Sequence, residues 1–91
     1  MLQTISITVS GKVQGVFFRQ STKEKAQQLG ITGQVKNRPD DTVHILATGT
    51  KQQLDELVSW CGHGPPKASV TAVLLKEQTL QSFKGFTIER S

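Results

Sequence analysis

The chain has 91 residues, and no apolar run approaches the roughly 20 residues that span a bilayer, so we expect residues 1–91 to form one domain without a membrane partner. The single cysteine excludes an internal disulfide, and no signal peptide follows Met1, which together favour a cytoplasmic location. The net charge of +4 favours anions in general, but the Lys and Arg residues are scattered and Tyr is absent, so we expect no nucleic-acid partner.

The first third of the chain has the pattern of a strand followed by a helix. Near the N-terminus every second residue is apolar, as in a half-buried strand: Ile5, Ile7 and Val9. Gly11 and Gly15 interrupt this alternation, and a helical stripe then extends to the stop signal at Gly30, made by Phe18, Thr22, Ala26 and Leu29. The helix starts either near Phe18 or three residues later, because Ser21 and Glu24 could form a capping box.

The rest of the chain predicts a hairpin, a helix and two strands. Strands at residues 31–36 and 43–47 are joined across residues 38–41, where Pro and Asp favour a turn. Thr50 and Gln53 have the spacing of a capping box, and the helix that they start has an apolar face formed by Leu54, Leu57, Val58 and Cys61. Gly and Pro residues end this helix. A fourth strand follows at Val70, Ala72 and Leu74, and residues 83–88 predict a short fifth.

This order of elements, β-α-β-β-α-β with a short terminal strand, predicts an α+β fold of the ferredoxin-like sandwich type. We expect a mostly antiparallel sheet with strand order 4-1-3-2, the fifth strand at an edge, and both helices on one face. The same fold hosts many unrelated activities, so the fold alone predicts no function.

Most residues with reactive side chains have ordinary structural explanations. Cys61 lies on an apolar helix face and is expected to be a buried hydrophobe rather than a nucleophile. His44 and His63 lack the spacing of metal ligands, and His44 is out of phase with the apolar residues of its strand, so it should face the opposite side of the sheet. Asp40 and Asp41 fit a turn better than a pair of catalytic acids. We therefore expect no metal site.

The segment GKVQGVFFR, residues 11–19, joins the first strand to the first helix. A helix N-terminus presents unpaired N–H groups and partial positive charge, and Gly15 can adopt the positive φ that lets successive N–H groups surround an anion. Arg19 adds a fork of donors that matches phosphate or carboxylate. Four apolar side chains would anchor the segment in the core or screen it from water: Val13, Val16, Phe17 and Phe18. Taken alone, the segment fits a structural strand-to-helix turn with a solvated arginine slightly better than it fits an anion site.

Asn37 is a second feature that favours an anion site. It follows the strand at residues 31–36, which the predicted topology makes parallel to the first strand. Asn37 can therefore come near the same rim of the sheet as the segment at residues 11–19. Asn is common in turns, but beside an anion site Asn37 becomes a candidate to hold a water.

The chain resembles the acylphosphatase family over nearly its whole length. GKVQGVFFR is similar to the family's phosphate-loop signature, and GQVKN with Val43 and Gly49 resembles its second signature; GPPKASV and GFTIE are similar to further segments. Two positions depart from the family, which usually has an aromatic residue in place of Gln34 and glycine in place of Asp41. We expect Gln34 to reduce packing on one sheet face and Asp41 to fit a left-handed turn position less well than glycine.

The resemblance implies hydrolysis of the mixed anhydride between a carboxylic acid and phosphate, with no cofactor or metal. The implied phosphate-binding residues, whose backbone N–H groups would surround the phosphate, are Gln14, Gly15, Val16, Phe17, Phe18 and Arg19. Arg19 would also clamp the phosphate through its side chain, and Asn37 would orient the attacking water, so these two are the implied catalytic residues. The implied partners are small acyl phosphates and inorganic phosphate. The protein would make few specific contacts with the acyl group.

Two alternatives stay open at this point. One is a non-catalytic anion- or RNA-binding module on the same fold, although the exposed aromatic pairs of sheet-face RNA recognition are missing. The other is a domain that binds acyl phosphates without hydrolysing them. We expect a monomer, because the sequence pattern contains no obvious apolar surface patch.

Overall fold

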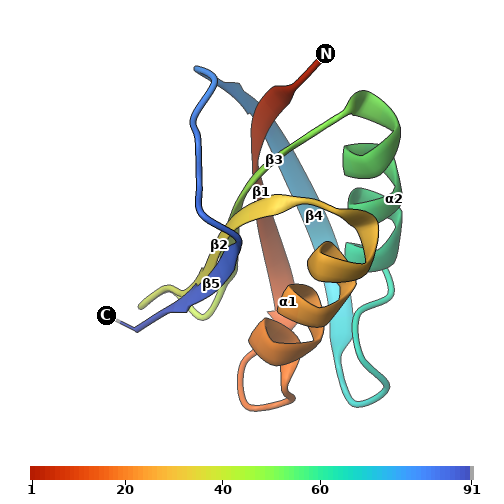
Figure 1. Cartoon of the computed structure of the whole chain (residues 1–91). Helices are drawn as coiled ribbons and strands as arrows, with labels where there is room; N and C mark the ends of the chain where they lie inside the picture. The colour runs from red at the N-terminus through yellow and green to blue at the C-terminus, as the bar shows by residue number, and fades with distance from the viewer. Residues whose placement is uncertain (91) are drawn as a thin grey trace.

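A computed structural model describes residues 1–90, which form a five-stranded sheet and two helices (Figure 1). The strands are β1 (Gln3–Lys12), β2 (Thr32–Asn37), β3 (Val43–Gly49), β4 (Ser69–Gln78) and β5 (Phe86–Glu89). The helices are α1 (Phe18–Leu29) and α2 (Lys51–Cys61). Both helices cover the same face of the sheet, which confirms the predicted ferredoxin-like α+β fold (Figure 1).

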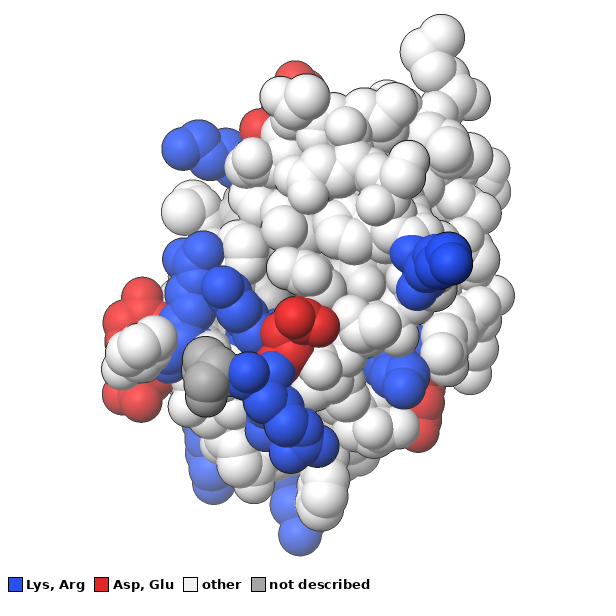
Figure 2. Space-filling view, turned by 60° about the vertical axis from the view of Figure 1, so that its left-hand side comes forward, with Lys and Arg blue, Asp and Glu red and all other residues white. Residues whose placement is uncertain are grey.

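The strand order in the sheet is β4-β1-β3-β2-β5, as predicted, and β5 forms the edge beside β2. β1 and β2 each pair antiparallel with β3, so they run in the same direction, and β5 pairs parallel with β2. The carboxyl ends of β1, β2 and β5 therefore lie at the same end of the sheet. Figure 2, which brings the β5 side forward, shows Lys and Arg side chains gathered over the lower half of that face.

The hydrophobic core lies between the sheet and the helices. β1 and β3 contribute side chains with no exposed surface, including Ile7, Val9 and Ile45. α1 buries Phe18, Thr22 and Ala26, and α2 buries Leu54, Leu57 and Cys61. Burial raises the pKa of the Cys61 thiol to about 12, so this cysteine is the neutral, buried hydrophobe that the sequence predicts.

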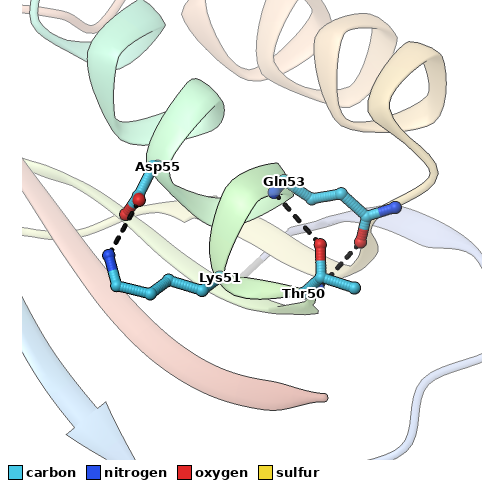
Figure 3. Close-up of polar contacts among 4 residues, drawn as sticks. All are labelled: Thr50, Lys51, Gln53 and Asp55. Carbon is cyan, nitrogen blue, oxygen red and sulfur yellow. Dashed lines mark hydrogen bonds and ion pairs between the residues drawn. The ribbon is translucent and has the colours of Figure 1, made fainter. Parts of the chain in front are cut away.

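The predicted capping box starts α2 (Figure 3). The hydroxyl of Thr50 accepts a hydrogen bond from the backbone N–H of Gln53 at 3.2 Å, and the Gln53 side chain accepts one from the N–H of Thr50 at 2.8 Å. Such a cap typically stabilises a helix by about 1 kcal/mol. Lys51 and Asp55 form an ion pair on the exposed side of the same turn, where solvent screening leaves it a small effect (Figure 3).

α1 begins at Phe18 without a side-chain cap, so the alternative start at a Ser21–Glu24 capping box is wrong. Glu24 instead accepts a hydrogen bond from the side chain of Gln20 at 3.1 Å. Phe17, the residue before the helix, has left-handed backbone angles with φ 63° and ψ 24°. The first intrahelical hydrogen bond runs from the N–H of Ser21 to the carbonyl of Phe17, which leaves the N–H groups of residues 18–20 ahead of it.

The predicted phase of β4 is wrong over most of its length. Ser10 pairs with Ala72 but Gly11 pairs with Val70, so β4 contains one extra residue at this point. A bulge of this kind shifts the side-chain alternation by one residue. Val70 and Val73 consequently pack against the core, whereas Leu74 is 71% exposed.

The hairpin between β2 and β3 confirms that Asp40 and Asp41 are turn residues. The N–H of Asp41 donates to the carbonyl of Arg38 at 3.1 Å, and the carboxylate of Asp40 accepts from the N–H and the hydroxyl of Thr42. These hydrogen bonds from Thr42 lower the pKa of Asp40. Asp41 has a φ of 71°, the left-handed conformation that glycine adopts at less cost.

Replacing Asp41 with Gly is therefore expected to raise the free energy of unfolding by up to about 1 kcal/mol, because it removes a left-handed strain of that order. Urea unfolding at neutral pH measures the change. Asp40→Gly is the matched control, and it should destabilise the fold because it removes the acceptor of both Thr42 hydrogen bonds. A clear loss of stability in Asp41→Gly would contradict the strain at this position.

Candidate active site

The segment between β1 and α1 is fixed by three of its four apolar side chains. Val13, Val16 and Phe18 are at most 5% exposed and form part of the core. Phe17 is 78% exposed, so it does not anchor the segment in the core, which was the first of the two roles expected for these side chains. Gly15 has the predicted positive φ, at 75°. Two left-handed residues, Gly15 and Phe17, curve this short segment between rigid ends.

The curved segment presents a run of backbone donors. Within the described chain, the N–H groups of residues 14–20 donate no hydrogen bond to another residue. Ser21 is the next residue along the chain, and its N–H donates to the carbonyl of Phe17. The N-terminal end of α1 adds partial positive charge at the same place. Unpaired N–H groups on a concave backbone are a typical anion-binding arrangement.

A cavity of about 280 Å³ opens beside this segment, at the edge where β1, β2 and β5 end. Its lining comes from three parts of the chain: Val13, Gly15, Phe17, Phe18, Arg19, Gln20, Asn37, Ile88 and Arg90. Arg19 and Arg90 bring two positive charges, and within residues 1–90 the only ion pair joins Lys51 and Asp55. No carboxylate among these residues therefore neutralises either guanidinium.

Asn37 supplies the most unusual polar atom of the cavity wall. Its Oδ1 is buried and accepts no hydrogen bond from any residue in the described part of the chain. Buried polar atoms without a partner are rare, because each forfeits the hydrogen bonds that it made to water in the unfolded chain. An acceptor held in this way suits a small donor inside the cavity.

Gln14 and Val16, two of the six predicted phosphate-binding residues, do not line the cavity. The side-chain amide of Gln14 instead donates to two carbonyls of the β2–β3 hairpin, those of Arg38 and Thr42, each at 2.9 Å. These bonds connect the β1–α1 segment to the turn that directly follows Asn37. Gln14 therefore holds the two halves of the cavity in one relative position, a role that the sequence did not predict.

Replacing Gln14 with Ala is expected to lower the free energy of unfolding by about 1–2 kcal/mol and kcat/KM by roughly tenfold, because both hydrogen bonds to the hairpin are lost. Urea unfolding measures the first effect, and steady-state hydrolysis of acetyl phosphate, the activity that the family resemblance implies, measures the second. Gln28→Ala on the exposed side of α1 is the matched control and should change neither. Full activity in Gln14→Ala would show that the hairpin contact does not position the cavity.

Ile88 and Arg90 are cavity residues that the sequence analysis missed. β5 runs parallel to β2, and Lys36 pairs with Glu89, so Arg90, the residue that follows β5, comes level with Asn37. The sequence pattern predicts the last strand at an edge of the sheet but indicates neither its neighbour nor its direction. If the last strand had been predicted to pair parallel with the strand that ends at Asn37, residue 90 would have been expected beside Asn37.

The two histidines contribute nothing to this cavity. His44 is half-buried between the fully buried Val43 and Ile45, as its phase predicts, and burial lowers its pKa, helped by the positive charges of Arg38 and Lys36. Among residues 1–90, no group of three or more His, Cys, Asp or Glu side chains could hold a metal ion. No helix in this part of the chain is long and apolar enough to cross a membrane.

The family model that matches the chain is described as Acylphosphatase and covers residues 5–88. An acylphosphatase of Acaryochloris marina is 45% identical, with 94% of this chain and 92% of the relative aligned. The solved structure of an acylphosphatase from Coxiella burnetii superposes with a TM-score of 0.94 at 40% identity, covering 97% of this chain and 93% of that one. The acylphosphatase of Bacillus subtilis gives 0.93 at 36% identity, with 99% and 100% covered. The chain belongs to the acylphosphatase family.

Proposed function

We propose that this acylphosphatase holds the phosphoryl group of its substrate with the side chain of Arg19 and with the N–H groups of residues 14–19, of which Gly15, Phe17, Phe18 and Arg19 line the cavity, and that Asn37 orients the attacking water. The reaction is the hydrolysis of a carboxyl–phosphate anhydride to a carboxylate and inorganic phosphate. The observation that carries the proposal is that Arg19 and Asn37 line the same cavity, and that the side-chain Oδ1 of Asn37 has no hydrogen-bond partner in the described chain. No observation favours the non-catalytic anion- or RNA-binding module.

Arg19 and the backbone donors suit the charge of a phosphoryl group. A guanidinium makes two parallel hydrogen bonds to neighbouring phosphate oxygens, and these bonds are stronger than neutral ones. The N–H groups of the β1–α1 segment can meet the remaining oxygens, where negative charge is spread in the transition state. Because these donors are fixed before the substrate arrives, little reorganisation is needed during the reaction.

Asn37 suits the position of the attacking water. Its Oδ1 can accept a hydrogen bond from a water molecule and fix the direction of the water's lone pair toward phosphorus. The leaving group is a carboxylate whose conjugate acid has a pKa of roughly 4, so it can depart without a general acid. The proton of the attacking water passes to an oxygen of the substrate's own phosphate. The proposed chemistry therefore rests on positioning and charge, without a metal ion.

Thermal unfolding in inorganic phosphate tests the phosphate site without turnover. Phosphate at ten times its dissociation constant should add about 1.4 kcal/mol to the stability, which corresponds to roughly 5–10 °C in Tm for a domain of this size. Chloride at matched ionic strength is the control, sulfate should act like phosphate, and Arg19→Gln should lose most of the shift. Equal Tm values in phosphate and chloride would overturn the proposed site. Acetyl phosphate hydrolysis that survives treatment with EDTA tests the independence from metal.

We further propose that the enzyme acts as a cytoplasmic monomer. The residues that line the cavity include Arg19, Asn37 and part of the β1–α1 segment, so the proposed reaction requires no residue from a second copy. The buried, unpaired thiol of Cys61 is compatible with a reducing compartment. Sedimentation equilibrium across a range of concentrations tests the monomer, and a dimer at micromolar concentration would contradict it.

A further inference from the structure

Phe17 combines two features that cost folding free energy. It has a φ of 63°, which is an outlier for a bulky side chain, and its ring is 78% exposed to solvent. Val13, Val16 and Phe18 already fix the β1–α1 segment in the core, so an exposed ring at position 17 is not needed as an anchor. A large apolar side chain held in solvent at the mouth of a reaction cavity suggests contact with the substrate.

Phe17 separates two depressions of the surface. It lines the phosphate cavity, and it also lines a neighbouring groove of about 280 Å³ that lacks Asn37 and both arginines of that cavity. The residues of this second depression, which we call the acyl groove, are Val16, Phe17, Ser21, Pro65, Pro66 and Lys67. Most of its lining is apolar, so it can contact a hydrocarbon group but offers few partners to a phosphate.

The far wall of the acyl groove is held in place. The N–H of Ala68 donates to the carbonyl of Pro65 at 2.9 Å, which closes the turn between α2 and β4. Gly64, just before this turn, lies so close to the buried ring of Phe18 that a Cβ there would come within 2.7 Å of it. Pro65 and Pro66 therefore form a wall whose distance from the β1–α1 segment is fixed by packing.

The topology places the acyl groove on the side of the β1–α1 segment away from Asn37. Asn37 ends β2, whereas the turn at Pro65 and Pro66 leads into β4, whose first residue, Ser69, pairs with Lys12 at the end of β1. In the sheet order β4-β1-β3-β2-β5, the segment after β1 lies between these two sides. In an in-line displacement at phosphorus, the attacking water and the leaving oxygen are on opposite sides. With the attacking water held by Asn37, as proposed above, the leaving carboxylate is expected on the side of Phe17.

We propose that the acyl groove binds the acyl group of the substrate, and that Phe17 selects acyl phosphates with aromatic or bulky hydrocarbon groups over acetyl phosphate. The proposal rests on the phosphate site and the attacking water described under Proposed function. The acyl groove thus revises the expectation that the protein makes few specific contacts with the acyl group. The ring of Phe17 stacks on one side of the acyl group, and Pro65 and Pro66 contact the other.

Steady-state hydrolysis of benzoyl phosphate and acetyl phosphate by the whole enzyme tests the proposal. The readout is the ratio of kcat/KM for benzoyl phosphate to that for acetyl phosphate, because a general loss of activity cancels in this ratio. Phe17→Ala should reduce the ratio by about tenfold, which is a typical change when an apolar contact is removed from a binding pocket. Pro66→Ser, on the far wall, should reduce it about threefold, as a smaller loss of the same kind.

Leu74→Ala is the matched control, because Leu74 is an exposed apolar residue on β4 that belongs to neither depression, and both kcat/KM values should stay as in the wild type. A ratio that is unchanged in Phe17→Ala and in Pro66→Ser would overturn the acyl groove, while hydrolysis of both substrates would leave the phosphate site standing. Absence of hydrolysis in the wild-type enzyme would instead overturn the proposed function, so the two failures are distinguishable.

Discussion

Replacing Arg19 with Gln is expected to lower kcat/KM for acetyl phosphate by at least about a hundredfold. The substitution removes a charge-assisted contact that strengthens as negative charge spreads over the phosphoryl oxygens, and a hundredfold corresponds to about 2.7 kcal/mol. The fold should be preserved, because Arg19 lines the cavity and is not part of the core. Steady-state kinetics measure the loss, and unfolding experiments on the same variant confirm that it is folded.

Arg19→Lys separates charge from geometry. Lysine retains the positive charge but offers a single ammonium group in place of the planar fork of donors, so we expect nearly the same loss as in Arg19→Gln. Arg38→Gln is the matched control, since the guanidinium of Arg38 does not line the cavity. A lysine variant with wild-type activity would show that Arg19 contributes only a general positive charge.

Replacing Asn37 with Ala is expected to lower kcat by about a hundredfold and to leave the inhibition constant of inorganic phosphate close to that of the wild type. Loss of the acceptor removes the fixed direction of the attacking water, and misplacement of a reactant by about 1 Å is sufficient for an effect of that size. Phosphate binding should be retained, because it depends on Arg19 and the β1–α1 segment. Competitive inhibition by phosphate, measured alongside kcat, distinguishes the two effects.

Stability gives an independent measurement on the same Asn37 variant. The wild-type Oδ1 is buried without a partner in the described chain, so its removal should not lower the free energy of unfolding by the amount expected for a hydrogen-bonded asparagine. If stability and phosphate affinity both fall with kcat, Asn37 shapes the hairpin rather than the water site. Wild-type stability with a low kcat would support the assignment.

The arrangement of strands and helices could be predicted because each element has a clear local signal. Alternating Ile5, Ile7 and Val9 indicate a strand, and Thr50 with Gln53 marks a helix start that the structure shows as a reciprocal cap. The start of α1 could not be fixed in the same way, because Phe17 carries no side-chain signal for the left-handed conformation that ends the loop. The prediction of which β4 side chains face the core was wrong because the bulge depends on the pairing of β4 with β1, which lies far away in the sequence.

The site was predictable where its residues follow strand ends and not where they depend on tertiary pairing. Arg19 was expected at the junction of the first strand and the first helix, and Asn37 at the end of a strand predicted to be parallel to the first. The structure brings both to the same cavity. Arg90 enters the cavity through the parallel register of β5 on β2, which residue patterns in a short terminal strand do not reveal. The backbone N–H of Gln14 was assigned to phosphate because its segment resembles the signature, but the hydrogen bonds of its side-chain amide to the hairpin were not predicted.

The contact between Gln14 and the hairpin limits how the protein can be engineered. Exposed hairpin tips are usually the positions that accept inserted peptides, fusion partners or new chain ends. Here the tip provides the two carbonyls, of Arg38 and Thr42, that the Gln14 side chain binds. An epitope inserted between these residues would separate the two acceptors and release the β1–α1 segment from the end of β2. This exposed turn is therefore a poor place for grafting, although it lies outside the reaction cavity.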